Sequence, residues 1–249
     1  MDKIEFPYRA PLTCMVQADN PDRIKELMSL ARDAGADSFG MQFERLRPEY
    51  RNKETYRELF EYAEDNPVYV TNYRLYENLG KSDGELAEEL VEIAECGSVL
   101  VDVMGDLFSP SDNELTDDPD AVERQKSLIA ELHRKGAVVL MSSHVDEFLS
   151  PECILEMAEK QKSRGVDVCK IVTQAKNKSE ELQIFSAIDL LRKKLGAPFL
   201  LLCGGECRAI RLFGAHFGNC TSLCVYEYDK FATKEQPLLA DMKMAEKLL

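Results

Sequence analysis

The sequence predicts one α/β domain, a (β/α)8 TIM barrel that spans residues 1–249. The chain of 249 residues has the length that is typical of a single barrel of this kind. Short apolar runs alternate eight times with amphipathic helical stretches, an order that favours a closed parallel sheet. An open doubly wound sheet is the main alternative, but no Gly-x-Gly-x-x-Gly follows the first run.

The expected elements follow one another in βα pairs along the whole chain. The expected strands are residues 12–17, 37–43, 68–73, 98–104, 137–144, 167–174, 198–204 and 221–227. The expected helices run from residue 21, near 53–65 and 83–96, up to about 135, and near 151–164, 178–195, 206–217 and 236–249. Asn20 before Pro21 is a suitable cap for the first helix. Glycines in Ala-Gly-Ala-Asp, Arg-Lys-Gly-Ala, Arg-Gly-Val-Asp and Lys-Leu-Gly-Ala stand where left-handed caps are expected to end helices.

Composition excludes several classes of function. The net charge is −14, and an acidic surface repels phosphate backbones and anionic membranes, so we expect neither nucleic acid nor membrane as a partner. No apolar run approaches the roughly 18 residues of a membrane helix, and the first residues lack a signal-peptide core, which predicts a cytoplasmic protein. The eight cysteines form no Cys-x-x-Cys pair, and no His, Asp and Glu cluster falls at the expected strand ends. We therefore expect no bound metal and no other cofactor.

Catalytic groups in such barrels come from the C-terminal ends of the strands, and Lys170 is the most unusual residue there. It lies within the apolar run DVCKIVTQ, where either face of the strand is dry and disfavours the charged form of the amine. A neutral amine can attack a ketone, although a lysine that reaches outward or pairs with an acid fits the same pattern. His144 ends the preceding strand, about 5 Å away in a barrel, so imidazole and amine can meet at the mouth. The other histidines, His133 and His216, fall in expected helices.

Three segments give a more specific indication. MSSHVDEF, DVCKIVTQAKNKSE and LLCGGECRAIRLFGAHFGNCTSL resemble the type I 3-dehydroquinate dehydratase family. The resemblance implies that Lys170 forms a Schiff base, that His144 is the general acid/base, and that Arg211 holds a substrate carboxylate. It also implies substrate-binding roles for Arg74 and Gln236, a homodimer, and conversion of 3-dehydroquinate to 3-dehydroshikimate in the shikimate pathway.

The second expected strand departs from that family. Where the family has Glu-x-Arg, this chain has Gly40 and Gln42, so the acid that orients the histidine and an arginine that contacts substrate are both replaced. Gln42 remains a candidate substrate-binding residue at that position. Glu44 shares strand parity with Gly40 and Gln42 and is a candidate replacement for the acid, although a solvated loop glutamate is an equally good interpretation.

Three functions therefore stay open. The first is 3-dehydroquinate dehydration, and the second is a class I aldolase or Schiff-base lyase that acts on a different anionic ketone. The third is a non-catalytic barrel that binds a metabolite. The departures on the second strand count against the first, while Lys170, His144 and Arg211 together count against the third.

Overall fold

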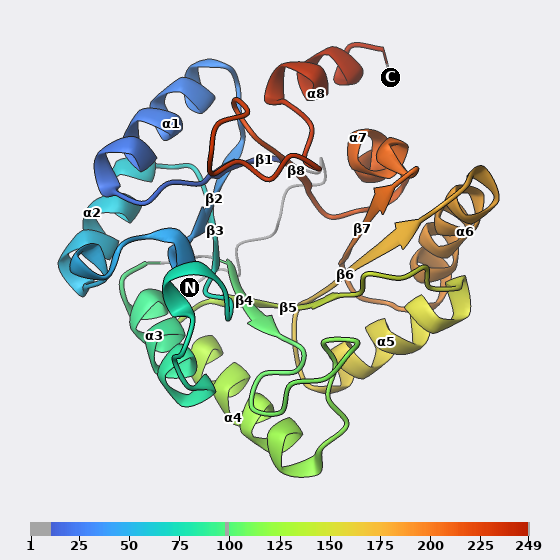
Figure 1. Ribbon diagram of the computed structural model, residues 1–249, viewed down its shortest axis with the longest axis horizontal. Coiled ribbons are helices and arrows are strands. Elements are labelled where there is room, and N and C mark those ends of the chain that lie inside the picture. The colour runs from blue at the N-terminus through green and yellow to red at the C-terminus, as the bar shows by residue number, and fades with distance from the viewer. Residues whose placement is uncertain (1–10, 98–99, 249) are drawn as a thin grey trace.

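The computed structural model describes residues 11–97 and 100–248, and these form eight parallel strands alternating with eight α-helices. The strands are β1 (Leu12–Val16), β2 (Ser38–Gln42), β3 (Val68–Thr71), β4 (Leu100–Met104), β5 (Val138–His144), β6 (Val168–Ala175), β7 (Phe199–Gly205) and β8 (Ser222–Cys224). The helices are α1 (Pro21–Asp33), α2 (Lys53–Ala63), α3 (Asp83–Glu95), α4 (Pro119–Arg134), α5 (Pro151–Ser163), α6 (Lys178–Lys194), α7 (Arg208–Phe217) and α8 (Leu239–Glu246). Figure 1 shows the helices around the outside of a ring of strands, which confirms the predicted TIM barrel.

The sheet order is β7-β6-β5-β4-β3-β2-β1-β8, so each strand pairs with its neighbour in sequence and β8 returns to β1. The seam between β7 and β8 is joined just before β8 begins. There the Cys220 amide donates to the carbonyl of Phe199 at 2.9 Å, and the Leu201 amide donates to Asn219 Oδ1 at 2.8 Å. The curled sheet thus has no long free edge at this seam.

Local sequence signals set most of the element ends. The side chain of Asn20 accepts a hydrogen bond from the Arg23 amide, so the predicted cap of α1 is confirmed. The glycines expected after helix ends have a positive φ, for example +87° at Gly35 and at Gly136. Two expected ends are wrong, because β8 stops at Cys224 and α8 begins only at Leu239. The chain between them folds over the barrel mouth, and the Tyr228 hydroxyl donates to the Gln236 carbonyl at 2.8 Å.

Two apolar clusters divide the interior. The larger one lies between the sheet and the helices, while a smaller one fills the lumen with side chains such as Met15, Tyr69, Leu140, Leu200 and Leu223. This packing fills the lumen below the C-terminal ends of the strands with apolar side chains. Among the described helices, none is both long and apolar enough to cross a membrane.

Candidate active site

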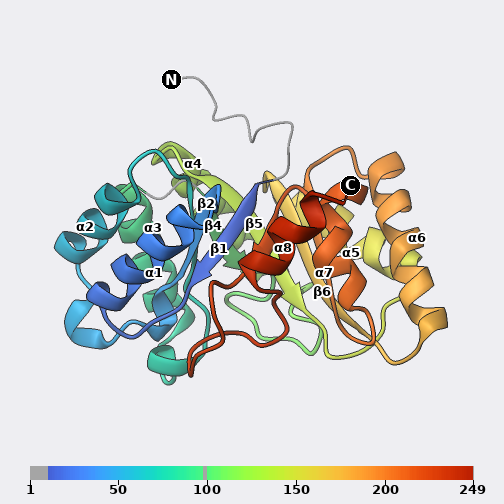
Figure 2. The same ribbon diagram turned by 90° about the horizontal axis from the view of Figure 1, so that it is seen from above.

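A cavity of about 360 Å³ opens at the C-terminal ends of the strands. Figure 2 shows the loop that follows β8 on the same side of the barrel as the tips of β1 and β6, where this mouth lies. Every residue that the sequence predicted for the site lines the cavity: Gln42, Glu44, Arg74, His144, Lys170, Arg211 and Gln236. The predicted residues therefore lie around one cavity, and the contacts of each side chain decide what it can do.

The amine of Lys170 lies inside a compact polar cluster. Its Nζ is 3.1 Å from Asp102 Oδ2, 2.9 Å from the Tyr69 hydroxyl and 2.8 Å from the Tyr73 hydroxyl. The whole residue is only 4% exposed, and the Asp102 side chain is fully buried. The lysine thus meets both parts of the sequence-based expectation, since it is buried in the lumen and it is also paired with an acid.

Asp102 is the acceptor at the centre of this cluster. Its Oδ1 accepts a hydrogen bond from Ser142 Oγ at 2.6 Å, and its Oδ2 accepts from both tyrosine hydroxyls as well as from the amine. Burial, followed by the charge of Asp102, raises the pKa of Tyr69 and of Tyr73 well above the usual value of a phenol. Both tyrosines therefore stay protonated and act as hydrogen-bond donors to the carboxylate.

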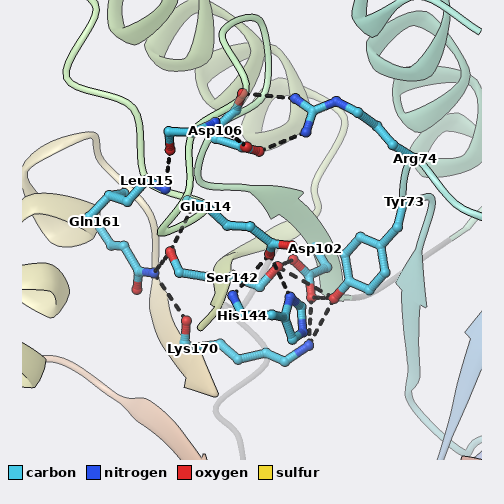
Figure 3. Close-up of polar contacts among 12 residues, drawn as sticks. Tyr73, Arg74, Asp102, Asp106, Glu114, Leu115, Ser142, His144, Gln161 and Lys170 are labelled. Atoms are coloured by element: carbon cyan, nitrogen blue, oxygen red, sulfur yellow. Dashed lines mark hydrogen bonds and ion pairs between the residues drawn. The ribbon is translucent and has the colours of Figure 1, made fainter. Parts of the chain in front are cut away.

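His144 lies two residues closer to the C-terminal ends of the strands than the level of Lys170. In the β5–β6 register Ser142 is opposite Lys170, and His144 is opposite Val172. The imidazole packs edge-on against the ring of Tyr73, with 5.4 Å between the centroids. Figure 3 shows the imidazole and the amine of Lys170 on the same side of the Asp102 carboxylate, facing one space. The predicted juxtaposition of imidazole and amine at the mouth is present in this arrangement.

Glu114, from the loop between β4 and α4, holds the histidine. Its Oε2 is 2.8 Å from His144 Nδ1 and also accepts a hydrogen bond from the His144 amide at 2.9 Å. Burial raises the pKa of Glu114, but the hydrogen bonds and charge of His144 outweigh it and leave the pKa below the usual value. With Nδ1 engaged by a carboxylate, Nε2 is the nitrogen left for chemistry. The hypothesis that Glu44 replaces the missing orienting acid is wrong in geometry, because Glu114 occupies that place.

The backbone of this loop explains why Glu114 reaches β5. Glu114 has a positive φ of 46°, and its carbonyl accepts a hydrogen bond from Ser143 Oγ at 2.8 Å. Gly105 makes the approach possible, since a Cβ there would lie 2.5 Å from the Glu114 carbonyl oxygen. The glycine and the strained residue together fix the loop against the strand end.

Arg211 supplies a cation without a carboxylate partner among the described residues. Its Nε donates to the Cys203 carbonyl at 2.9 Å, and the rest of the guanidinium borders the cavity. Burial lowers the pKa of this arginine below its usual value, although a guanidinium stays charged at neutral pH. On the loop after β8, Gln236 is 6% exposed, and its Oε1 has no hydrogen-bond partner in the described part of the chain. A buried cation and an unpaired amide oxygen in one cavity favour a ligand with an anionic group and a hydrogen-bond donor.

The guanidinium of Arg74, which the resemblance assigns to substrate binding, is engaged by two acidic residues of the protein. Asp83 accepts from its Nε at 2.6 Å and from its Nη2 at 2.9 Å. Asp106 accepts from its Nη1 at 2.8 Å, and the Asp106 carbonyl accepts from its Nη2 at 2.8 Å. The side chain borders the cavity, but these bonds use nearly all of its donors to join the loops after β3 and β4.

The region after β2 differs from expectation in detail. The strand ends at Gln42, so Glu44 belongs to a 3-10 turn (Phe43–Arg45), where strand parity no longer applies. Gln42 Oε1 is occupied by two donors, Gln17 Nε2 at 2.7 Å and Arg45 Nε at 2.6 Å. Glu44 is completely buried, and the Thr71 hydroxyl lies 2.9 Å from both of its carboxylate oxygens. Burial raises the pKa of Glu44 to about 7, so this acid is neutral in a large fraction of molecules at physiological pH.

Space next to Gly40 is filled by Met15. A Cβ on Gly40 would lie 2.1 Å from Met15 Sδ, so even alanine does not fit without movement of the methionine. A glutamate, as in the family pattern, would fit at this position only if Met15 moved aside.

Sequence reasoning missed five groups that the structure brings to the site: Tyr69, Tyr73, Asp102, Glu114 and Arg45. An acid within the apolar run SVLVDVM and two tyrosines four residues apart were the available signals for the first three. In the described part of the chain, no group of three or more His, Cys, Asp and Glu side chains is placed to bind a metal ion.

The fold and this site define the chain as a (β/α)8 barrel with a lumen lysine, a carboxylate-held histidine and, at the mouth, an arginine that has no carboxylate partner among the described residues. Residues 13–248 match the family model described as Type I 3-dehydroquinase. The protein belongs to the type I 3-dehydroquinase family, whose members are Schiff-base lyases. Among curated proteins, none matches this sequence directly.

Solved structures agree with this fold at low identity. The 3-dehydroquinate dehydratase of Geobacillus kaustophilus HTA426 has a TM-score of 0.82 and 17% identity, covering 97% of this chain and 91% of that chain. The type I enzyme of Clostridium difficile has a TM-score of 0.79 and 19% identity, with coverages of 96% and 92%. The dehydratase of Aquifex aeolicus VF5 has a TM-score of 0.72 and 16% identity, with coverages of 96% and 98%.

Proposed function

We propose that this protein forms a Schiff base between Lys170 and an anionic ketone and eliminates water from it, as in the dehydration of 3-dehydroquinate to 3-dehydroshikimate. One observation carries the proposal. The buried amine of Lys170, the imidazole of His144 and the unpaired guanidinium of Arg211 border the same cavity. A protein that only bound a metabolite would have no need for a buried amine beside a carboxylate-held imidazole.

In the proposed steps Lys170 forms the imine and later releases it, and His144 accepts one proton and later returns it. The amine of Lys170 adds to the ketone carbon and water leaves, which gives an iminium ion. The iminium withdraws electrons and acidifies the neighbouring C–H, whose proton passes to Nε2 of His144. The same proton then goes to the β-hydroxyl as the C–O bond breaks and water departs. Hydrolysis of the imine releases the enone and restores the amine.

Two further residues support an anionic, hydroxylated substrate. Arg211 can bond a carboxylate with two parallel N–H donors, and this pairing offsets the cost of burying its charge. Gln236 has an acceptor oxygen that a substrate hydroxyl would satisfy.

A second candidate is a class I aldolase or lyase that acts on a different anionic ketone. The wall formed by β2 favours it, because Met15 fills the space next to Gly40 and Gln42 is engaged by Gln17 and Arg45. The histidine-orienting acid and the substrate-contacting arginine of the family pattern are therefore replaced on β2, while the amine and imidazole remain.

The test is borohydride trapping combined with turnover. The protein is incubated with 3-dehydroquinate, pyruvate or acetoacetate in the presence of borohydride, and the adduct is located by mass and peptide mapping. We expect a reduced adduct on Lys170 and conversion of 3-dehydroquinate to the enone. An adduct only with other ketones would favour the second candidate, and no adduct with any ketone would refute both.

Matched lysine variants make the result specific. Lys170→Ala is expected to abolish the adduct and turnover while the protein still folds. Lys193→Ala removes an exposed lysine of α6, whose side chain is 69% exposed, and is expected to behave as the wild type. Turnover retained in Lys170→Ala would contradict the mechanism.

A further inference from the structure

Two phenols, rather than one, contact the amine of Lys170. The Tyr73 hydroxyl lies 2.8 Å from Nζ and donates to Asp102 Oδ2, and the Tyr69 hydroxyl makes the same pair of contacts at 2.9 Å and 2.5 Å. Each tyrosine thus forms a continuous hydrogen-bond chain from the amine, through its own hydroxyl, to the carboxylate. Such a chain can move a proton in either direction without a net change of charge on the phenol.

Tyr69 and Tyr73 occupy different positions in the barrel. Tyr69 belongs to β3 and packs in the lumen cluster. Tyr73 follows the end of β3, and its ring packs edge-on against the imidazole of His144. In Figure 3 the Tyr73 hydroxyl meets the Lys170 amine on the side where the His144 ring lies. A ketone that reaches both Lys170 and His144 must therefore place its reacting carbon close to Tyr73.

The protonation state of Tyr73 decides between two chemical roles. Burial and the neighbouring charge of Asp102 raise its pKa well above the usual value, so a free phenolate is strongly disfavoured. The hydroxyl cannot act as a store that gives up its proton and waits. It can act as a relay that receives one proton as it passes on another, because it then stays neutral throughout.

We propose that Tyr73 is a catalytic proton relay between Asp102 and the substrate oxygen when the Schiff base on Lys170 forms and is hydrolysed. This inference rests on the proposed function. In the first step one proton moves from the Lys170 ammonium to the Tyr73 oxygen as the Tyr73 proton moves to Asp102. The neutral amine then forms the C–N bond, and the carbonyl π electrons go to oxygen, which takes a proton from the nitrogen to give the carbinolamine.

The return transfer removes water. Asp102 gives its proton to the Tyr73 oxygen as the Tyr73 proton moves to the carbinolamine hydroxyl. The C–O bond breaks, the nitrogen lone pair forms the C=N bond, and water leaves. The products are an iminium ion, one water molecule and an ionised Asp102, so atoms and charges balance. Hydrolysis runs the same transfers in reverse.

The experiment measures how fast the trappable imine forms. Protein and ketone (3-dehydroquinate, or whichever of pyruvate and acetoacetate gives the Lys170 adduct) are mixed under single-turnover conditions and quenched with borohydride after increasing delays. We expect Tyr73→Phe to slow adduct formation about 10²-fold or more, which is the contribution of one positioned proton-transfer group. The final yield of adduct is expected to be unchanged, because a relay alters the rates in both directions equally. A merely structural loss of Lys170 placement would lower the yield instead.

Two tyrosine variants serve as comparisons. Tyr69→Phe removes a hydroxyl from the same amine and carboxylate on the lumen side and is expected to slow trapping less than about tenfold. Tyr56→Phe removes a buried phenol that donates to Glu89 outside the cavity, and it is expected to trap at the wild-type rate. Thermal unfolding of each variant confirms that the barrel is intact. Replacement of Tyr73 by 3-fluorotyrosine keeps the shape and the hydroxyl but changes its acidity, so the trapping rate is expected to change.

The outcomes separate this inference from the proposed function. No wild-type adduct with any of the three ketones would refute the proposed function. A wild-type adduct with an unaltered trapping rate in Tyr73→Phe would overturn the relay and leave the Schiff base standing. Equal slowing in Tyr69→Phe and Tyr73→Phe would also overturn it, since the proton path would then not be specific to Tyr73.

Discussion

Glu44 is a fully buried carboxyl whose ionisation opposes folding, and this makes it a sharp test of the site's electrostatics. No cation forms an ion pair with it among the described residues, and the only side chain that donates to it is the Thr71 hydroxyl. Burial is the largest cause of the rise of its pKa from an ordinary value of 4.5 to about 7. The perturbation that we consider is Glu44→Gln, which keeps the size of the side chain and removes the titration.

The direction in which stability changes with pH follows from the raised pKa of Glu44. Because the folded-state pKa is raised, stabilisation by the neutral form is fully present below about pH 4.5 and is lost as the pH rises to about 7. Between these values the unfolded chain releases the proton while the folded chain retains it. A difference of about 2.5 units at ~1.36 kcal/mol each gives a loss of roughly 3 kcal/mol in the free energy of unfolding. Glu44→Gln is therefore expected to be more stable than the wild type by about this amount at pH 8, relative to their difference at pH 4.

The assay is urea unfolding followed by circular dichroism at pH 4, 5, 6, 7 and 8 for both proteins. The difference between the two free energies is expected to grow steadily from pH 4.5 to 7 and then level off. Glu156→Gln, in which a side chain that is 70% exposed loses its charge, is the control and is expected to follow the wild type. A difference between Glu44→Gln and wild type that does not vary with pH would show that folding leaves the pKa of Glu44 unchanged and would refute the reasoning.

Three other predictions follow from contacts in the cavity. Glu114→Gln removes the charge that holds His144 Nδ1. Loss of this charge-assisted hydrogen bond, about 1.5–3 kcal/mol, is expected to lower kcat roughly 10- to 100-fold. A kcat within twofold of wild type would contradict this. Arg211→Met is expected to raise KM about 30-fold or more for a carboxylated ketone but not for an uncharged one, as measured by initial rates on both. Gly40→Ala forces a Cβ against Met15 and is expected to cost about 1–3 kcal/mol in urea unfolding, most of which Met15→Ala should recover; additive losses in the double variant would show that the two sites do not touch.

The sequence was sufficient for the fold because its signals are local and repeated. Alternating apolar runs and helices, an Asn20 cap and left-handed glycines such as Gly136 each depend on a few neighbouring residues. Lys170 and His144 were predictable for a related reason, since adjacent parallel strands bring their ends together.

Loop conformation and distant ion pairs limited the prediction of the site. Glu114 reaches His144 because its backbone has a positive φ and Gly105 permits a close approach, and neither property follows from the acidic segment around it. Arg74 is bound by Asp83 and Asp106, which are 9 and 32 residues away, so the family pattern alone could not show that its guanidinium is engaged.

The two kinds of group that β2 lacks both border the cavity from other positions. The acid that the family pattern places at Gly40 would require Met15 to move, and here Glu114 brings a carboxylate to His144 from the loop after β4. The arginine that the pattern places at Gln42 is absent, yet Arg45 borders the cavity three residues later and donates to Gln42.

Such replacements preserve the type of group while they change its direction. Glu114 contacts Nδ1 of His144 at 2.8 Å, so Nε2 of the imidazole stays available for proton transfer. The guanidinium of Arg45 instead lies over the ring of Tyr76, at 4.0 Å from its centroid, and no longer projects from a strand. Chemistry at the amine is thus more constrained than recognition at the rim, and selectivity among anionic ketones is where this chain is expected to differ most from its relatives.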